Sequence, residues 1–435
     1  MKIVINEKEV DAIQGETIIE TIRRAGFPIP SLCYAGNAKH KSSCMVCAVK
    51  NSVTGQMLPS CTTMPTEGMR IETDSPEVMA SRTLSLELLL SEHRADCEAP
   101  CKIACPGNMD VAAMNRLYDA GKTDEALTLL RDTLVIPATL CYICNAPCEK
   151  ICRKGDLNRP VPIREIKKKL VSQTDLNTIV PPATHNGKKV AVTGSGPAAL
   201  AAAYHLCRRG YETFIFEPSG MLLTPYIQSE NVPADIIDLE MEVIKKTGIK
   251  IEYTSDSPPT EEFDAIIHPV VKTKQPARMV FEGHRMAREM HASLTPASCP
   301  TFLPEENRKT FNSTYSRFTD AEKKRLTESP TTQTHCLYCD CEGKATCHLR
   351  RYATEYGIRN SRYSKDGAHE ALCRQEVNKN IRFEPAKCIK CGLCVYNSDN
   401  GFTFKDRGFA MQVILPEGNE NNINEQLTEL CPTSA

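Results

Sequence analysis

Residues 33–61 read CYAGNAKHKSSCMVCAVKNSVTGQMLPSC and space four cysteines as Cys33-x10-Cys44-x2-Cys47-x13-Cys61. Thiolates are the soft ligands that iron–sulfur clusters and zinc require. Structural zinc sites favour two short Cys-x2-4-Cys knuckles, whereas this stretch has one knuckle and two distant single cysteines. Small residues fill the loop, as backbone N–H groups need when they approach the sulfides of a cluster. The stretch therefore predicts a [2Fe–2S] cluster in preference to zinc.

The whole chain has 22 cysteines in 435 residues, and disulfides are the competing use for them. Disulfides belong to oxidising compartments, but the N-terminus MKIVINEKEV shows no secretory signal pattern. No apolar run approaches the roughly 18 residues of a membrane span. The formal net charge of -1 gives no general attraction for nucleic acid or an anionic membrane. We therefore expect a cytoplasmic protein with no nucleic-acid partner and no direct membrane insertion.

The residues around the first cysteines predict a small α+β domain. Two short strands are expected at 2–6 and 9–13, followed by a helix through 17–25. Together with the cysteine spacing, the phrases LPSCTTMPTEGMRIET (58–73) and SLELLLSEHRADC (85–97) resemble the front of the complex I large iron–sulfur subunit and of iron-only hydrogenases. The resemblance implies a β-grasp [2Fe–2S] ferredoxin domain over residues 1–82.

Residues 83–182 have apolar residues at helical spacing, with cysteines between and after the helices. The segments HRADCEAPCKIACPGNMD (93–110) and LCYICNAPCEKICRKGDLNRPVPIREIKKKL (140–170) resemble the N-terminal domain of the glutamate synthase small subunit and of dihydropyrimidine dehydrogenase. The resemblance implies a helical domain with two [4Fe–4S] clusters. It places Cys105, Cys141, Cys148 and Cys152 on one cluster, and Cys97 and Cys101 on the other.

Two positions depart from that family. Lys167 stands where the family has a Gln or Glu ligand, and a protonated lysine has no lone pair to donate. His93 stands where the family usually has a cysteine. The complex I subunit also has a histidine-ligated cluster, so we predict a site formed by His93, Cys97, Cys101 and Cys144. The alternative places His93 on a helix surface and Cys144 in ordinary packing.

Residues 183–295 predict a truncated Rossmann-like domain. Gly194-x-Gly196-x-x-Ala199 lies between a predicted strand and helix, and Glu217 follows where a carboxylate would bind a ribose. The resemblance to the glutamate synthase small subunit continues here, but the nicotinamide-binding insertion and the late Gly-Asp motif are absent. Two interpretations stay open, namely a retained FAD site and an empty scaffold, and the missing contacts favour the scaffold. No independent NAD(P)H site is expected.

The C-terminal third contains two more groups of cysteines. Within residues 296–385, a Cys-rich metal-binding segment offers Cys336, Cys339, Cys341 and Cys347 to either zinc or an iron–sulfur cluster, with Cys373 as a substitute ligand. Residues 386–435 contain Cys388-x2-Cys391-x2-Cys394, the ferredoxin triplet, and end in Cys431-Pro432. This module resembles bacterial ferredoxins with one of their two clusters deleted, which implies a single [4Fe–4S] cluster.

These modules together predict a multidomain α+β and α/β protein with one [2Fe–2S] and three or four [4Fe–4S] clusters, one of which is replaced by zinc in the alternative reading. The function expected is an electron-transfer subunit of a larger oxidoreductase, with other subunits and a soluble ferredoxin as partners. One alternative is an FAD-containing enzyme similar to the glutamate synthase small subunit. A minor alternative is a zinc-rich interaction protein.

Overall fold

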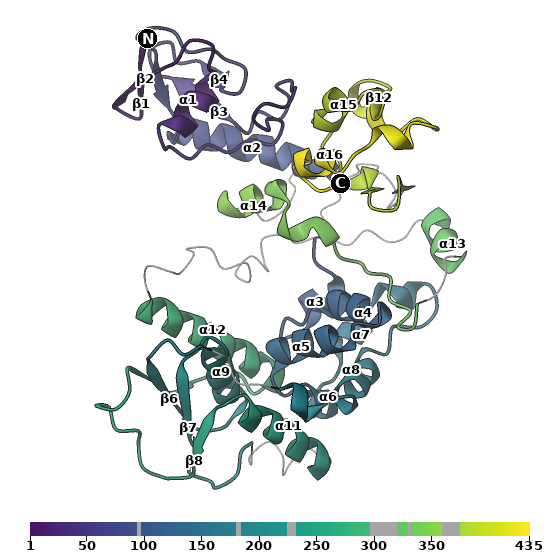
Figure 1. Ribbon diagram of the computed structural model, residues 1–435. Helices are drawn as coiled ribbons and strands as arrows, with labels where there is room; N and C mark the ends of the chain where they lie inside the picture. The colour runs from purple at the N-terminus through teal and green to yellow at the C-terminus, as the bar shows by residue number, and fades with distance from the viewer. Residues whose placement is uncertain (94–96, 180–183, 224–231, 296–319, 329–331, 359–374) are drawn as a thin grey trace. The chain divides into compact units, whose positions relative to one another are not determined.

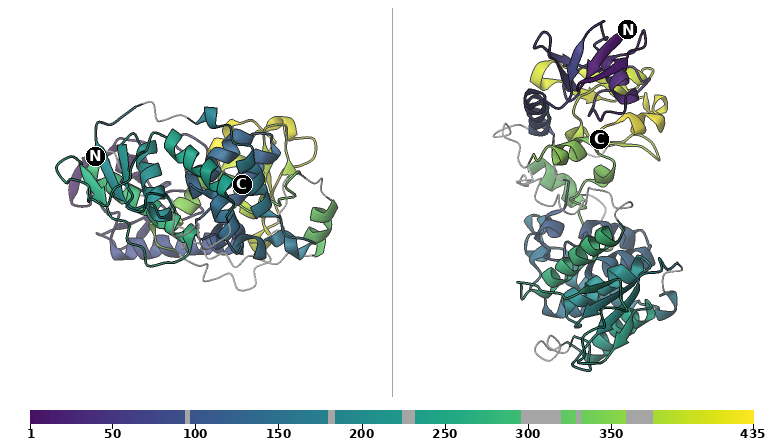
Figure 2. Two further views of the ribbon diagram at one scale, coloured as in Figure 1. Left: turned by 90° about the horizontal axis from the view of Figure 1, so that it is seen from below. Right: turned by 90° about the vertical axis from the view of Figure 1, so that its left-hand side faces the viewer.

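The computed structural model describes residues 1–93, 97–179, 184–223, 232–295, 320–328, 332–358 and 375–435 (Figures 1 and 2). Cys299 and Cys373 lie outside the described residues. The chain forms two compact units. Of the described residues, those up to Cys97 and those from Cys341 onward belong to the first unit, and those between Glu98 and Asp340 belong to the second. The second unit is thus an insertion into the first, with Cys97 and Cys341 on either side of it.

The N-terminal part of the first unit is a five-stranded sheet with one helix packed on it. The strand order is β2-β1-β5-β3-β4, with β1 and β5 parallel and the other pairs antiparallel. Helix α1 begins with a capping box, because Glu20 accepts a hydrogen bond from the Thr17 backbone N–H at 2.7 Å. The two expected strands and the helix are confirmed within two residues, as β1 Lys2–Ile5, β2 Lys8–Asp11 and α1 Ile18–Arg24. The other strands of the sheet are β3 Ala48–Asn51, β4 Met57–Pro59 and β5 Arg70–Glu72.

A segment from the far end of the chain completes this core. Helix α14 (His348–Glu355) places Leu349, Tyr352 and Ala353 in the same buried cluster as the sheet residues and Leu86 of α2 (Pro76–Glu92). Arg82 of α2 donates to the Ala48 carbonyl and, at 3.1 Å, to the Tyr356 hydroxyl. The N-terminal domain and this later helix therefore fold together.

The last part of the first unit is a small module with its own core of Phe383, Phe402, Val413 and Leu427. Its regular elements are short, so turns around the cysteines dominate its backbone. They are the antiparallel pairs β10 Gln375–Glu376 with β11 Arg382–Phe383 and β12 Thr403–Lys405 with β13 Gln412–Ile414, the helices α15 Leu393–Asn397 and α16 Gln426–Leu430, and the 3-10 turns η5 Pro385–Lys387, η6 Gly408–Ala410 and η7 Glu420–Asn422.

The second unit begins with a helical domain, as the sequence predicts. Its helices are amphipathic and bury their apolar faces in a shared core, to which α5 contributes Leu127, Leu130 and Leu134. The elements are α3 Pro100–Ala104, α4 Val111–Asp119, α5 Thr123–Leu134, α6 Pro137–Ile143, α7 Pro147–Lys150, η1 Arg153–Asp156, α8 Ile163–Ser172 and η2 Leu176–Thr178. Helix α13 Asp320–Glu328 follows later in the second unit, whereas the 3-10 turn η4 Glu342–Ala345 belongs to the first unit.

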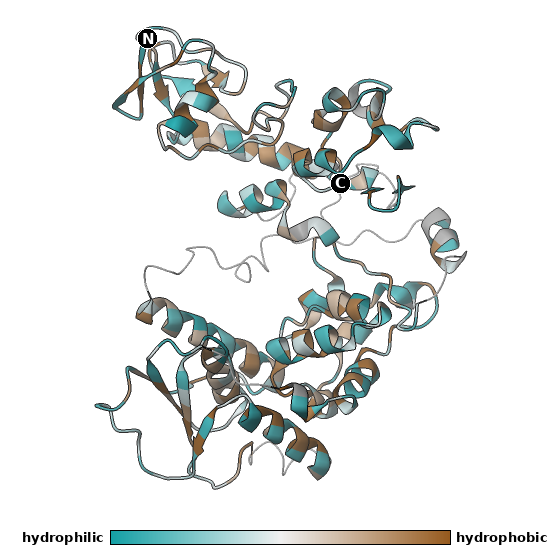
Figure 3. Cartoon of the chain, in the orientation of Figure 1, coloured by the Kyte–Doolittle hydropathy of each residue, from teal (hydrophilic) through white to brown (hydrophobic). Residues whose placement is uncertain are grey.

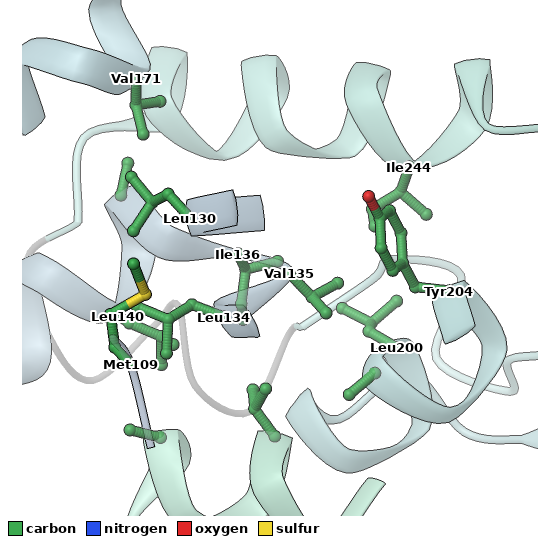
Figure 4. Packing of buried hydrophobic residues seen from close by; sticks show 14 of the residues in the cluster. Met109, Leu130, Leu134, Val135, Ile136, Leu140, Val171, Leu200, Tyr204 and Ile244 are labelled. Atoms are coloured by element: carbon green, nitrogen blue, oxygen red, sulfur yellow. The ribbon is translucent and has the colours of Figure 1, made fainter. Parts of the chain in front are cut away.

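A four-stranded parallel sheet of order β8-β7-β6-β9 forms the rest of the second unit. Its core is continuous with that of the helical domain. Figure 4 shows Val135 and Ile136, which connect α5 to α6, between the leucines of the helical domain and the residues Leu200 and Tyr204 of α9, a helix of the sheet domain. The elements are β6 Lys189–Thr193, α9 Pro197–Arg208, β7 Glu212–Phe216, α11 Ala234–Lys246, β8 Lys250–Glu252, β9 Ala265–Ile267 and α12 Pro276–Leu294.

Within the described part of the chain, no single helix is long and apolar enough to cross a membrane. Helices α5 and α6 together pass that test by length and composition, but they meet at a bend of 66°. Figure 3 shows polar and apolar residues alternating along the helices of this domain. Their apolar residues, among them Leu130 and Leu140, are buried in the unit's own core.

Candidate metal centres

Cys33, Cys44, Cys47 and Cys61 converge in the N-terminal domain, and all four are buried. Hydrogen bonds from the Cys44 and Cys61 thiols lower the pKa of Cys33 far below its usual range, and the bond from Cys61 lowers the pKa of Cys47 to about 6. The same bonds raise the pKa values of Cys44 and Cys61. Backbone N–H groups of Ser43 and Cys44 also point at the Cys33 sulfur. The four thiols are thus close enough to hydrogen-bond to one another, and a bound metal cluster would replace their protons.

Cys388, Cys391, Cys394 and Cys431 line one cavity of about 550 Å³ in the C-terminal module. The Lys390 backbone N–H donates to the Cys388 sulfur at 3.3 Å, and the Ala435 N–H donates to the Cys431 sulfur at 3.3 Å. Burial raises the pKa values of Cys391 and Cys394 to about 12. Burial therefore disfavours the thiolates, and a cationic cluster core would stabilise them. The backbone N–H groups that donate to the sulfurs also favour their negative charge.

His93, Cys97, Cys341 and Cys347 are four buried ligand candidates of the first unit, and we treat them as a third group. The Cys341 backbone N–H donates to the Cys97 carbonyl at 3.3 Å, which joins the two sides of the insertion. Nδ1 of His93 lies 2.8 Å from the Lys387 carbonyl, which can only accept a hydrogen bond. The neutral ring therefore carries its proton on Nδ1, and Nε2 has the lone pair that a metal needs. Burial, with Cys341 and Cys431 nearby, raises the pKa of Cys347 to about 11.

A fourth group surrounds Lys167 on α8 in the second unit. Its members are Cys105, Cys141, Cys144 and Cys148. Burial lowers the pKa of the Lys167 ammonium, but these four thiols together raise it above its usual value. The expected loss of a ligand at Lys167 is consistent with this arrangement, since the lysine supplies a buried positive charge and Cys144 supplies a fourth sulfur.

The remaining four ligand candidates, Cys101, Cys152, Cys336 and Cys339, also belong to the second unit and line one small pocket. The boundary between the two units falls between Cys97 and Glu98 and again between Asp340 and Cys341. The unusual Cys339-x-Cys341 spacing was the one signal of this division in the sequence. The ligand sets expected from the sequence stay predictions.

Within the described residues, no three His, Cys, Asp or Glu side chains converge tightly enough to hold a single metal ion. The groups above are sets of sulfurs around a shared space, and a cluster with several irons spans more space than one ion does.

The glycine turn of the predicted nucleotide site has the expected backbone, but the Glu217 carboxylate accepts a hydrogen bond from its own loop. Gly194 adopts a φ of 78°, Gly196 caps the N-terminus of α9, and Ala199 is a buried residue in the first turn of that helix. The Glu217 carboxylate accepts the Ser219 backbone N–H at 2.8 Å, and the Ser195 hydroxyl accepts the Leu223 N–H at 3.1 Å. Although burial raises the pKa of Glu217, bonds from Ser195 and Ser219 hold it below its usual value. The carboxylate thus stabilises its own loop.

Three histidines of the second unit, His268, His284 and His291, lie in structural contacts. His284 Nε2 lies 2.8 Å from the Thr133 carbonyl, and burial lowers the pKa of His284 to about 4. His291 Nδ1 lies 2.9 Å from the Tyr211 hydroxyl, and His268 lies beside Thr193.

Comparison with known proteins identifies three domains in these units. Residues 1–76 match the 2Fe-2S iron-sulfur cluster binding domain, residues 85–178 match dihydropyrimidine dehydrogenase domain II with its 4Fe-4S cluster, and residues 381–435 match the 4Fe-4S single cluster domain. The chain is an iron–sulfur protein. Each matched domain contains one of the cysteine groups described above, which confirms one [2Fe–2S] centre and accompanying [4Fe–4S] centres.

Curated relatives of this iron–sulfur protein come from several oxidoreductases. It is 33% identical to the NADP(+)-dependent formate dehydrogenase subunit beta of Moorella thermoacetica over 36% of this chain and 26% of the relative. It is 30% identical to the NADPH-Fe(3+) oxidoreductase subunit beta of Geobacter sulfurreducens over 36% of this chain and 24% of the relative. It is 30% identical to the glutamate synthase [NADPH] small chain of Bacillus subtilis over 40% of each. The chain thus spans well under half the length of these relatives.

Among solved structures, the NAD+-reducing [NiFe]-hydrogenase in its H2-reduced state is similar over 21% of this chain and 38% of the hydrogenase chain, at 26% identity and a TM-score of 0.20.

Proposed function

We propose that this iron–sulfur protein is an electron-transfer subunit of a multisubunit oxidoreductase. When bound, iron–sulfur clusters supply one-electron chemistry. The observation that carries the proposal is the adjacency of ligand groups inside the first unit. Cys33 of the [2Fe–2S] group is among the charges that act on Cys391 of the C-terminal group, and Cys431 of that group acts on Cys347. Three groups in succession form a row along which single electrons can pass.

Specific contacts fix this row. The Lys39 backbone N–H donates to Asn397 Oδ1 at 2.9 Å, and Asn397 Nδ2 donates back to the Lys39 carbonyl at 2.8 Å. Ile389 and Cys391 pack against the core of the N-terminal domain. Electron transfer slows steeply with distance, so a reciprocal hydrogen-bonded pair beside two cysteine groups keeps their separation constant.

The surroundings of each group differ in charge and hydrogen bonding, which are the terms that set a cluster's potential. The [2Fe–2S] and C-terminal groups receive backbone N–H donors, the third group contains an imidazole, and the fourth has the buried ammonium of Lys167. Such differences arrange potentials along a relay.

The proposal includes partners and a compartment. The described cysteines form no disulfide, which suits the reducing cytoplasm. The relatives are subunits or a small chain of oxidoreductases, and we infer that this chain likewise receives electrons from, or passes them to, other subunits or a soluble ferredoxin. Because the Glu217 carboxylate is hydrogen-bonded to its own loop, we propose that the parallel-sheet domain is a scaffold that binds neither flavin nor NAD(P)H.

Anaerobic purification with iron, acid-labile sulfide, zinc and flavin measured on one sample tests the proposal. One [2Fe–2S] and three [4Fe–4S] groups require about 14 irons per chain. Stepwise reduction followed by EPR should then resolve several centres at different potentials. Stoichiometric FAD would favour the alternative of a flavoenzyme similar to the glutamate synthase small subunit. A colourless protein that holds zinc alone would favour the zinc-rich interaction protein and overturn the relay.

A further inference from the structure

We propose that Cys101, Cys152, Cys336 and Cys339 bind one further [4Fe–4S] cluster, and that the segment 332–340 closes its site by supplying the last two ligands from more than 180 residues away in sequence. The inference rests on the iron–sulfur function proposed above. Two of the four proposed ligands, Cys336 and Cys339, lie outside all three matched domains.

The first argument is the convergence of four sulfurs on one pocket. Cys101 lies in the first turn of α3, and Cys152 follows α7. Cys336 and Cys339 come from the segment 332–340, yet all four cysteines line the same pocket. The thiols of Cys336, Cys339 and Cys152 also act electrostatically on that of Cys101, as neighbours in one pocket do. A cationic cluster core would hold four such thiolates together.

The second argument is the shape of the Cys336–Cys339 turn. Tyr338 has a φ of 47°, and its backbone N–H donates to the Cys336 sulfur at 3.5 Å. In the C-terminal module, which the comparisons assign to a 4Fe-4S domain, Lys390 has a φ of 56° and its N–H donates to the Cys388 sulfur at 3.3 Å. Both turns are Cys-x2-Cys, and both place the same backbone donor on the first sulfur. Segment 336–339 therefore has the local geometry of a cluster-binding turn.

The third argument is a buried side chain that points into the site. Asn115 of α4 is fully buried, lines the pocket and lies against the Cys336 thiol. Its amide nitrogen and oxygen have no hydrogen-bond partner of conventional geometry among the described residues. A buried amide without partners is costly, and the sulfides of a cluster are acceptors that its N–H groups could satisfy.

The fourth argument is the anchoring of the segment on α4. Asp119 accepts hydrogen bonds from the Thr334 N–H at 2.8 Å and from the Thr334 and Tyr338 hydroxyls at 2.5 Å. Arg116 forms a two-bond pair with Asp340, at 2.9 and 2.6 Å, and the Asp340 side chain is fully buried. Two carboxylates on opposite sides of the contact thus hold the segment just before and just after its cysteines. Such fixed, charge-assisted bonds suit a segment that must present ligands accurately.

The charge of the pocket agrees with an anionic occupant. A [4Fe–4S] cluster with four thiolate ligands is negative overall, and Arg153 and Lys154 line the pocket beside Cys152. The rest of the lining includes Val111, Val161 and Ile163, which exclude water.

The double variant C336A/C339A tests the inference in the full chain, purified anaerobically. We expect the loss of about four irons and four sulfides per chain and of one EPR-active centre. The other centres, in particular the one assigned to Cys105, Cys141, Cys144 and Cys148 in the same unit, should keep their signals. These retained signals report that the unit is still folded. Cys207→Ala is the matched control, because Cys207 is also a buried cysteine of this unit, but donates to the Thr247 carbonyl; its iron content should equal that of the wild type.

A second variant tests the anchoring independently of the sulfurs. Asp119→Ala keeps all four cysteines but removes both bonds to Thr334 and the bond to Tyr338, so the same EPR centre should become substoichiometric or broadened. Unchanged iron and EPR spectra in C336A/C339A would overturn the inference and leave the relay intact. Loss of one zinc with no loss of iron would also overturn it. A wild-type protein without iron would refute the proposed function instead.

Discussion

Lys167 is the residue whose charge has the most direct electronic consequence. Its ammonium is buried among the thiols of the fourth group, where little water screens it. Lys167→Met should make the potential of that cluster more negative by on the order of 100 mV, because a positive charge that favours the reduced state is lost. Lys168→Met is the control, since Lys168 is partly exposed and lies near Glu165. Equal shifts for the two variants in a redox titration followed by EPR would contradict the assignment.

Glu240 is a second buried charge, and it makes stability depend on pH. It accepts the Ala138 N–H at 2.6 Å and the Thr139 N–H at 2.9 Å, at the start of the helix that carries Cys141. Burial raises the pKa of Glu240 to about 7. Between its unfolded value near 4.5 and about 7, the folded state holds a proton that the unfolded state has released, so stability falls as pH rises through this window.

Glu240→Gln should remove that dependence. Relative to the wild type, the variant should gain apparent melting temperature between pH 5 and pH 8, corresponding to at most about 3 kcal/mol. Anaerobic thermal melts of both proteins at several pH values measure the difference. A difference that is the same at pH 5 and pH 8 would show that Glu240 does not titrate in this range.

At the scale of elements, the contact between α9 and α12 depends on one glycine. A Cβ placed on Gly283 would lie 2.2 Å from the Ala198 carbonyl oxygen and 2.8 Å from the Ala201 Cβ. Alanine gains about 1 kcal/mol of helix propensity over glycine, but the helices would have to move apart. Gly283→Ala should therefore destabilise the second unit by about 1–3 kcal/mol. Ser293→Ala, at an exposed position of the same helix, should change the melting temperature little.

The elements that the sequence predicts well are those with local causes. Alternating residues and the Thr17 capping box define the first strands and α1, and the glycine turn defines β6, α9 and β7. The role of α14 could not be predicted, because its partners on α2 and the N-terminal sheet lie more than 250 residues away. Short ferredoxin spacings such as Cys388-x2-Cys391 carry their geometry with them, and the comparisons confirm that module.

At the scale of the whole molecule, the insertion brings cysteines from distant parts of the sequence into one unit. Spacing along the chain identifies ligands when a site is made by one segment. It fails for Cys97 with Cys341 and for Cys101 with Cys336, since each pair is separated by most of an inserted domain. Neighbours of this kind could not be predicted from spacing, because tertiary folding alone brings them together.

The insertion also predicts that the clusters can be divided between two proteins. The Cys97 carbonyl and the Cys341 N–H are 3.3 Å apart, so a short Gly-Ser linker can join residues 1–97 to 341–435. This shortened chain should keep the [2Fe–2S] EPR signal and about ten irons, because every ligand of its three groups is retained. A chain of residues 98–340 should lack the [2Fe–2S] signal and hold two [4Fe–4S] clusters, about eight irons. If either protein instead lost a cluster whose four ligands it contains, the two units would share ligands, and the assignment of each group to one unit would be wrong.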